Sequence, residues 1–525
     1  MKTTGKIAGL ALMASMLLTG CGEHYDVLLW TSFGSAYTTA LDALIADVNE
    51  LTGFVVKNET QKSYPQLQTN INNSISTDSY PNIAMGYPDH FAGYIKSNIQ
   101  LALDSYIKAY DEEHGGSLLD DYYPEYMVEN QTLKYNINDE PYTMGLPFNK
   151  STEVIAYNGY FVDYAASINA DLATLPDTWD EWNTKGEQYM AVMDTLFGKK
   201  LYGVINDDDS VSGFQVVEAS AAAPSGKELL LDMTKVAKTR FKLLAWDALD
   251  NMFITLCRQW GGVYTSYTAQ DRKNNGGKGW ARFFDTSYTM DDGTVINPRE
   301  ITTSMLNYMK DLHAKDIIGM PSEINEGSYA SDAFKYGRTM FVICSSGGLS
   351  HNILGDFEVR VHAIPYKDAA HKKVISQGTN LALFDQGDEE TWQKGFDAIV
   401  ALTKGDIQGR WAAETGYFPA TKSATNSQVY QDLLNKPQKS MIKKVYQRSA
   451  KLNNEVYSDA AQNWDKFVDP GFIGSSQIRT AVEPIITMLF GNDKTIEQIF
   501  KKIMPTIRTY VSTETMNYID SLPAA

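Results

Sequence analysis

An alternation of strand and helix patterns near the start of the chain constrains the fold more than any other feature. Residues 25–33 form a largely apolar run that ends in Trp-Thr-Ser-Phe and is followed by Gly34, which predicts a strand. In residues 37–52 the apolar side chains recur at helical spacing, and Gly53 ends the pattern before the apolar residues 54–56. A β-α-β unit of this kind predicts an α/β fold with a parallel sheet.

The alternation continues with a predicted helix over residues 63–76 and a third strand over residues 81–87. Ligands of open α/β sheets bind outside the carboxyl ends of the strands. Trp30, Tyr64 and Tyr87 are therefore candidate ligand residues. Each of these aromatic residues could equally belong to a hydrophobic core.

The segment Leu146–Asn158 reads as a crossing between two lobes. A proline turn is followed by four polar residues (149–152) and then by a short apolar run, which is typical of a strand with hydrogen-bonding side chains at its entry. An ordinary loop before a strand is the alternative. The crossing is the better interpretation because other segments of the chain support it.

Further elements are predicted in the second half of the chain. Thr178 and Glu181 fit a capping box at the start of a helix that runs to about Phe197. Amphipathic helices are predicted over residues 243–260 and 298–313, with a loop over residues 264–292 between them, and the last helix over residues 496–511.

Small residues follow a predicted strand over residues 339–344. The sequence Ser345-Ser346-Gly347-Gly348 precedes a short helix from Leu349, so the backbone there could approach a ligand. A plain tight turn explains the same residues. A later strand, residues 377–384, contains Gly378.

Length and charge restrict the class of protein. A chain of 525 residues with 43% hydrophobic residues can bury two or more cores. Its formal net charge of −18 becomes −20 without the two lysines of the first segment. Such an acidic chain argues against nucleic acid as a partner.

The first 20 residues are predicted to be a signal peptide. Lys2 and Lys6 precede an apolar run too short to span a membrane, and Leu18-Thr19-Gly20-Cys21 resembles a bacterial lipobox. That resemblance makes Cys21 the lipidated first residue of the mature protein. Cys257 and Cys344 lie in apolar runs and are expected to be buried free thiols, with a disulfide as the alternative.

The sequence contains no catalytic or metal-binding motif. The seven histidines do not have ligand spacing, and no stretch fits a nucleophile elbow or a phosphate-binding loop. We therefore expect neither an enzyme, nor a cofactor, nor a metal site.

Taken together, these segments resemble the extracellular solute-binding proteins of ABC importers, the family that includes maltose-binding and glycerol-3-phosphate-binding proteins. The resemblance covers nearly the whole mature chain. The motifs that carry it are the lipobox, Leu146-Pro147-Phe148-Asn149 through Asn158, residues 176–179, residues 334–340, and Thr415-Gly416-Tyr417-Phe418-Pro419.

The resemblance implies an α/β, two-lobed periplasmic-binding-protein-like fold with discontinuous lobes and a ligand cleft at the hinge. The first lobe is expected at residues 24–151 plus 346–403, and the second at 152–345 plus 404–525. It further implies a monomer that is tethered by its lipid anchor on the extracytoplasmic side and delivers its solute to the importer's permease subunits.

The glycerol-3-phosphate binders resemble this chain most, and their contacts carry over to Tyr64, Ser151, Ser346, Gly378, Tyr417 and Arg479. Gly347, beside Ser346, is a further candidate through its backbone. Arg479 could clamp a phosphate, whereas Ser151 and the 346–347 backbone would supply neutral donors. Alternatively, Arg479 is a surface arginine paired with a carboxylate of its own helix.

Other observations leave the ligand open. Asp89 stands near the position where the relative has a glutamate, and Lys150 is expected to add a positive charge at the cleft mouth. Both a glycerol 3-phosphate-like polyol phosphate and an oligosaccharide fit the resemblance. The rival classes are a secreted glycan hydrolase, with Asp89 or Glu153 as its acid or base, and a glycan-binding surface lipoprotein.

Overall fold

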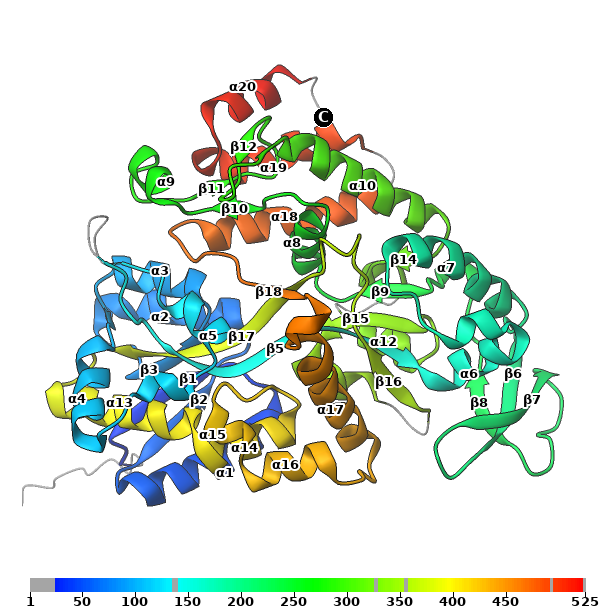
Figure 1. Ribbon diagram of the computed structural model, residues 1–525, viewed down its shortest axis with the longest axis horizontal. Coiled ribbons are helices and arrows are strands. Elements are labelled where there is room, and N and C mark those ends of the chain that lie inside the picture. Colours follow the sequence, from blue (N-terminus) through cyan, green and yellow to red (C-terminus); the bar gives the residue numbers. More distant parts are fainter. Residues whose placement is uncertain (1–23, 135–139, 325–328, 354–356, 492–493, 523–525) are drawn as a thin grey trace, which may run out of the picture.

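The computed structural model describes residues 24–134, 140–324, 329–353, 357–491 and 494–522. Helices flank a central sheet whose strands pair in the order β14 (Ile318–Gly319), β9 (Leu244–Trp246), β15 (Phe341–Ser345), β5 (Leu146–Asn158), β17 (Lys373–Phe384), β3 (Ile83–Gly86), β1 (Val27–Thr31) and β2 (Val56–Thr60). The elements gather into two lobes on either side of the pairing between β5 and β17 (Figure 1). This is the predicted two-lobed α/β architecture.

The first lobe begins with the predicted β-α-β units. Strand β1 (Val27–Thr31) pairs in parallel with β2 (Val56–Thr60) and β3 (Ile83–Gly86). Helix α1 (Ser35–Thr52) buries Leu41, Leu44, Ile45 and Val48, the face predicted by its periodicity. The lobe also contains α2 (Tyr64–Ser74), α3 (Pro88–Lys96), α4 (Asp104–His114), α13 (Glu389–Thr403) and α14 (Gly405–Thr415).

Strand β5 (Leu146–Asn158) runs through both lobes, as the crossing predicts. Its first half pairs with β17 (Lys373–Phe384), and its second half pairs with β15 (Phe341–Ser345) and β16 (Val359–His362). Twelve of its thirteen residues are buried. This long buried strand of the central sheet therefore connects the two lobes.

Two large hydrophobic cores define the lobes. The first contains buried residues from Val27 to Phe148 and from Leu381 to Trp411, and the second contains those from Val154 to Ile375 and from Val445 to Ile519. The packing therefore differs from the expected lobe boundaries. Residues 346–403 were expected in the first lobe, but those up to Ile375 pack in the second core. Residues from 404 onward were expected in the second lobe, but Trp411 packs in the first core. Because β16 pairs with the second half of β5, the chain returns to the first lobe only along β17.

Two helices predicted in the second lobe differ from the observed elements. Residues 243–260 divide into strand β9 (Leu244–Trp246) and helix α8 (Leu249–Gln259), and helix α19 (Ile496–Ile507) is followed by a further helix, α20 (Thr513–Ser521). The capping box of α7 (Trp179–Asp194) and the helix α10 (Pro298–Ala314) are as predicted. Helix α18 (Ser475–Phe490) packs against α8 and α19.

Residues 264–292, expected to be a loop, contain short elements that pack on the second core. Strand β10 (Thr265–Ser266) pairs with β11 (Trp280–Ala281), and α9 (Ala269–Asn274) connects them. Strand β12 (Tyr288–Thr289) pairs with β13 (Val295–Ile296) beyond them. Tyr264, Phe283 and Phe284 are buried in the core.

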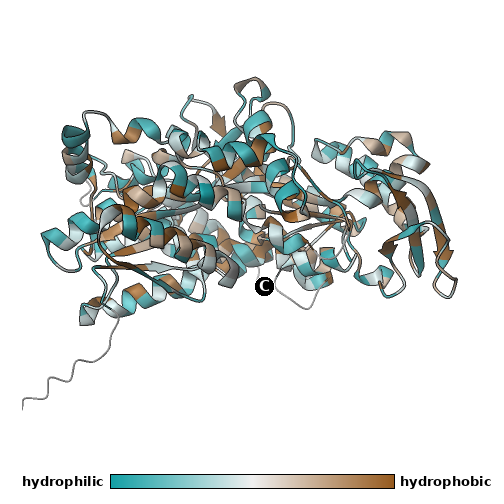
Figure 2. Ribbon diagram, turned by 90° about the horizontal axis from the view of Figure 1, so that it is seen from below, coloured by the Kyte–Doolittle hydropathy of each residue, from teal (hydrophilic) through white to brown (hydrophobic). Residues whose placement is uncertain are grey.

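A three-stranded sheet forms the end of the second lobe that points away from the first (Figures 1 and 2). Its strands are β6 (Lys199–Ile205), β7 (Val211–Glu218) and β8 (Glu228–Asp232). This sheet does not contribute to the junction of the lobes.

Cys257 and Cys344 are buried free thiols, as predicted, and burial raises the pKa of the Cys257 thiol to about 12. The signal peptide and Cys21 lie outside the described residues. Among the residues that are described, none of the helices has both the length and the apolar character of a membrane span.

Candidate ligand-binding cleft

A cavity of about 440 Å³ lies between the two lobes. The first lobe contributes the start of α2, the turn from β3 into α3, and Glu129. The second lobe contributes the turn from β9 into α8, residues 264–265, the segment after β18 (Asp465–Phe467), and α18. Strand β17 crosses the cavity wall with Ile375, Ser376 and Gln377.

Tyrosine side chains from both lobes line this cavity. The rings of Tyr64 and Tyr87 meet edge to face with their centroids 5.3 Å apart, and Tyr264 lies on the second lobe. Burial raises the pKa of all three phenols, so each hydroxyl remains protonated at neutral pH and can donate a hydrogen bond. Such rings offer a sugar-like solute both a flat apolar face and a polar edge.

Several buried polar atoms of the cavity-lining residues have no hydrogen-bond partner within the described chain. Buried polar groups are normally paired, because an unpaired one costs about 1–3 kcal/mol. Because these atoms are themselves buried in the cavity wall, a solute hydroxyl group or a water molecule would reach them only when the wall adjusts on binding. They are His90 Nδ1, Tyr264 Oη, Thr265 Oγ1, Ser376 Oγ, Gln377 Oε1 and Asp469 Oδ2.

Arg479 enters the cavity from α18 but is already engaged. Its Nε donates to Asp250 Oδ2 at 2.7 Å, and its Nη2 donates to Asn251 Oδ1. Although burial opposes its charge, Asp250 and Asp89 together raise the pKa of Arg479, so it stays a cation. The expected alternative of a surface arginine with a carboxylate partner in its own helix is therefore wrong, because Asp250 belongs to α8 and Arg479 lines the cavity.

The lobes touch at one end of the cavity. A Cβ atom on Gly471, in the second lobe, would lie 2.6 Å from backbone atoms of Pro88 in the first lobe. Only a glycine allows the two backbones to approach this closely. The segment around Gly471 thus closes the cavity against the start of α3.

The comparison by sequence decides the family. Residues 43–438 match the profile described as bacterial extracellular solute-binding protein. The chain belongs to this family of solute-binding proteins. A comparison with curated proteins finds none that matches.

Solved structures agree with this solute-binding fold. UgpB from Mycobacterium tuberculosis, in complex with glycerophosphocholine, is 15% identical with a TM-score of 0.62, over 92% of this chain and 98% of that one. An ABC substrate-binding protein from Listeria monocytogenes, in complex with cycloalternan, is 13% identical with a TM-score of 0.62, over 94% and 98%. Maltose-bound MalE3 of T. maritima is 12% identical with a TM-score of 0.60, over 92% and 98%.

Four predicted site residues of this solute-binding protein meet in the cavity. Tyr64, Tyr87, Asp89 and Arg479 all line it, although Arg479 lies nearly 400 positions from the others. Tyr64 and Tyr87 follow the rule that ligand residues lie beyond the strand ends. Their common location makes them the best-supported candidates from the sequence.

The other predicted residues lie outside the cavity lining. Most of them lie near the paired segments of β5 and β17, which form the hinge between the lobes. Ser151 Oγ accepts a hydrogen bond from Ser345 Oγ at 3.2 Å, and Ser346 Oγ accepts one from the backbone N–H of Thr152 at 3.2 Å. Gly347 lies against the ring of Tyr417, which stacks on Trp411 with centroids 6.0 Å apart. Trp30 packs against the first core, and Gly378 lies in β17 against Lys150 of β5.

Lys150 is not at the cleft mouth, which corrects that prediction. Its side chain is fully buried, and its Nζ donates to Glu129 Oε1 at 2.6 Å and to the Gly378 carbonyl at 3.1 Å. Glu129 also accepts from Asn380 at 2.7 Å. The charge of Lys150 is therefore neutralised inside the hinge.

Sequence reasoning missed Asp250, Tyr264, Ser376 and Gln377 of this solute-binding cleft. A signal existed for Asp250, because it lies just after a strand and opens a helix, as Tyr87 does. Reading residues 243–260 as one helix hid that turn. Ser376 and Gln377 had no local signal, since only the pairing of β17 with β5 brings them to the cavity.

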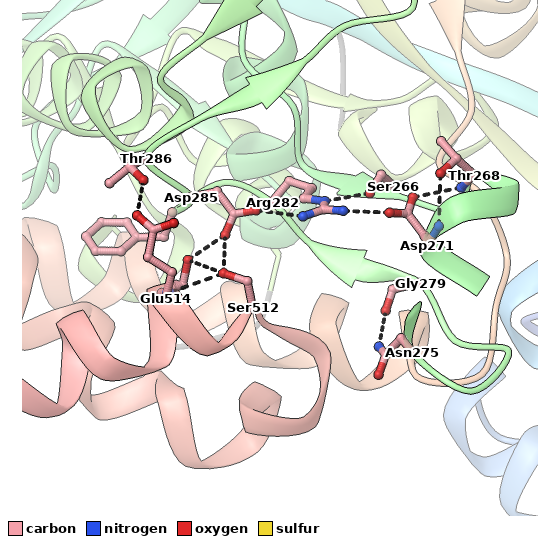
Figure 3. A network of polar contacts seen from close by, with 12 residues as sticks. Ser266, Thr268, Asp271, Asn275, Gly279, Arg282, Asp285, Thr286, Ser512 and Glu514 are labelled. Atoms are coloured by element: carbon pink, nitrogen blue, oxygen red, sulfur yellow. Dashed lines mark hydrogen bonds and ion pairs between the residues drawn. The ribbon is translucent and has the colours of Figure 1, made fainter. Parts of the chain in front are cut away.

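A polar network holds the 264–292 segment in place, as Figure 3 shows. Arg282 donates to Ser266 Oγ at 2.7 Å, to Asp271 at 2.6 Å and to Asp285 at 2.9 Å. Asp285 in turn accepts from Ser512 and Thr515 at the start of α20. The network fixes β10 beside the C-terminal helices, so Tyr264 and Thr265 form a preorganised wall of the cleft.

Glu153 lies in β5 outside the cavity lining, with a side chain only 1% exposed. Its carboxyl group contacts Trp246 Nε1 at 2.7 Å and Thr255 Oγ1 at 3.2 Å. Burial raises the pKa of Glu153 to about 8, and these contacts offset only part of the rise. The group is thus neutral in the folded protein at pH 7.

We expect the stability contribution of Glu153 to depend on pH. Its folded pKa of about 8 exceeds the value of about 4.3 for an unfolded glutamate, so the folded state binds more protons between these two values. The free energy of unfolding therefore falls as pH rises through this window. This fall is absent in Glu153→Gln. From pH 5 to pH 8, the free energy of unfolding of the variant should therefore rise by on the order of 2–4 kcal/mol relative to that of the wild type.

Urea unfolding of both proteins at several pH values measures the difference. Stability curves that run parallel from pH 5 to pH 8 would contradict the assignment. The buried Thr255→Val variant controls for the loss of a hydrogen bond at the same site without a titrating group.

Proposed function

We propose that this solute-binding protein captures a hydroxyl-rich small solute, a carbohydrate or polyol, in the cleft between its lobes and delivers it to the permease of an ABC importer. A glycerol 3-phosphate-like polyol phosphate and an oligosaccharide are the two forms that the sequence resemblance suggests. Cys21 would anchor the mature protein by a lipid on the extracytoplasmic side. It acts by binding and does not make or break bonds in the solute.

The observation that carries this proposal is the composition of the cavity. Tyrosine rings and unpaired buried polar atoms come to it from both lobes and from β17. A solute that contacts both lobes stabilises their closed arrangement, and a closed arrangement is what a permease can distinguish from the empty protein. The structures similar in fold were solved with carbohydrates or glycerophosphocholine, as reported above, which supports the same solute class.

Small-angle scattering tests closure directly. Saturating maltotriose, N-acetylglucosamine trimer or another bound solute should reduce the radius of gyration of the protein. A solute that contacts only one lobe would not shift the equilibrium. Binding of long glycans without compaction, or release of products from them, would contradict the proposal.

Tyr264→Phe tests the unpaired hydroxyl in the cavity wall. We expect it to weaken the binding of a hydroxylated solute by about 0.5–1.5 kcal/mol, since one hydrogen bond is lost while the ring remains. Calorimetric titration gives the affinity. Tyr336→Phe is the matched control, because Tyr336 is 60% exposed and lies outside the cavity lining, and it should leave the affinity unchanged.

A further inference from the structure

The cavity carries an excess of negative charge. Its lining includes five carboxylates, those of Asp89, Glu129, Asp250, Asp469 and Glu483. Three of them have a cation partner: Lys150 pairs with Glu129, Arg479 with Asp250, and Arg258 with Asp469 at 3.0 Å. Five carboxylates and three cations leave a net charge of −2.

The two remaining carboxylates form no ion pair with a lysine or an arginine in the described chain, although the charge of Arg479 acts on Asp89 at longer range. Asp89 Oδ1 lies 4.0 Å from His90 Nε2, but burial lowers the pKa of His90, so the imidazole is neutral at pH 7. Burial, with the charge of Asp250 nearby, raises the pKa of Glu483. The positive charge of a cation beside Glu483 would lower this pKa again and favour the ionised carboxylate.

Among the described residues that line this cavity, no lysine or arginine is free to pair with a phosphate. Arg479 already donates from Nε to a carboxylate and from Nη2 to Asn251, and Lys150 is enclosed within the hinge. An incoming phosphate would also approach the charges of Asp89 and Asp250. Like charges in a partly desolvated cleft repel, which disfavours an anionic solute.

The aromatic residues suit a cation as well. The faces of tyrosine rings attract ammonium groups, and Tyr64, Tyr87 and Tyr264 all line the cavity. Tyr264, Thr265 and Ser376 are each more than nine-tenths buried and retain a polar atom without a partner in the described chain. When the wall adjusts on binding, hydroxyl groups of the same solute can satisfy these atoms while its ammonium group lies near Asp89 and Glu483.

We infer that the cleft selects a hydroxylated solute that carries an ammonium group, such as an amino sugar, over neutral and phosphorylated solutes. This inference rests on the proposed function, because it names the charge of the solute bound in the same cleft. The carboxylates supply the selectivity, and the tyrosines and unpaired polar atoms supply the contacts that any hydroxylated solute would share.

Two probes with the same sugar backbone test the inference. Glucosamine trimer carries an ammonium group on each ring, whereas N-acetylglucosamine trimer is neutral. At about pH 6, where sugar amines are protonated, calorimetric titration of the purified protein should show at least about tenfold tighter binding of the glucosamine trimer. Higher ionic strength should reduce this ratio, because added salt screens charges at the partly exposed cleft.

Asp89→Asn and Glu483→Gln remove the two unpaired charges. Each should lower the ratio of the two affinities by roughly threefold to tenfold. Glu50→Gln is the matched control, because Glu50 is an exposed carboxylate of α1 outside the cavity lining, and it should leave the ratio unchanged.

The outcomes separate this inference from the proposed function. Equal affinity for both trimers, with compaction, would overturn the inference and leave the proposed function standing. Tighter binding of glycerol 3-phosphate than of the glucosamine trimer would also overturn the inference and leave the proposed function standing. Glycerophosphocholine carries both an ammonium group and a phosphate, so it shows whether the ammonium group is sufficient for binding when a phosphate accompanies it. If it binds more tightly than the glucosamine trimer, an amino sugar is not the preferred solute. Failure of every probe to bind would count against both.

Discussion

Replacing Lys150 by methionine is expected to lower the free energy of unfolding by about 3–5 kcal/mol. The substitution keeps the length of the side chain but leaves Glu129 as a buried carboxylate that retains only the amide of Asn380 as a partner in the described chain. Chemical denaturation monitored by tryptophan fluorescence measures the loss.

The double variant Lys150→Met with Glu129→Gln separates the charge from the packing. Because it removes both charges, it should recover much of the stability that the single variant loses. If the double variant is as unstable as Lys150→Met, the ion pair is not the cause of the loss. Glu129 also lines the cavity, so ligand affinity should change in both variants.

Gly378→Ala is expected to destabilise the protein by about 4 kcal/mol or more. Gly378 has a φ of +99°, and a Cβ atom there would lie 1.9 Å from the carbonyl oxygen of Asn149 in the neighbouring strand. The residue lies where β17 pairs with β5, so the backbone of the hinge itself would have to move. Thermal unfolding and the yield of folded protein measure the effect.

Gly226→Ala is the control for backbone strain alone. Gly226 also has a positive φ, of +71°, but a Cβ atom there meets nothing within 4 Å. It should cost only about 1–2 kcal/mol, the penalty of a left-handed conformation. Equal losses in the two variants would show that the close approach to Asn149 is not what requires Gly378.

Local patterns explain which parts of the fold the sequence predicts. The apolar period of α1 and the capping box of α7 involve residues within one or two helical turns, so they can be read directly. Residues 243–246, by contrast, are a continuous apolar run. Such a run fits a buried strand and a buried helix equally well, and only its pairing with β15 decides.

The site residues divide in the same way, into those predicted from local patterns and those whose position depends on tertiary structure. Tyr64 and Tyr87 were predicted because strand ends in an α/β sheet collect ligand residues, and Asp89 was predicted from the resemblance to the glycerol-3-phosphate binders. The position of Lys150 was wrong because its partners depend on tertiary structure: Glu129 lies 21 residues earlier and Gly378 lies 228 residues later. The lobe boundaries were misplaced for the same reason, since the pairing of β16 with β5 has no local signature.

The position of β17 has a consequence for the order in which the chain can fold. This strand lies between β3 and β5, and its residues Leu381 to Phe384 belong to the core of the first lobe. During synthesis or export, β3 and β5 therefore present unpaired edges until more than 370 residues have emerged. Open strand edges of this kind favour aggregation, and contacts of such long sequence separation form slowly. We expect refolding to be slow and sensitive to protein concentration, with the amino-terminal lobe completed only after most of the other lobe is available.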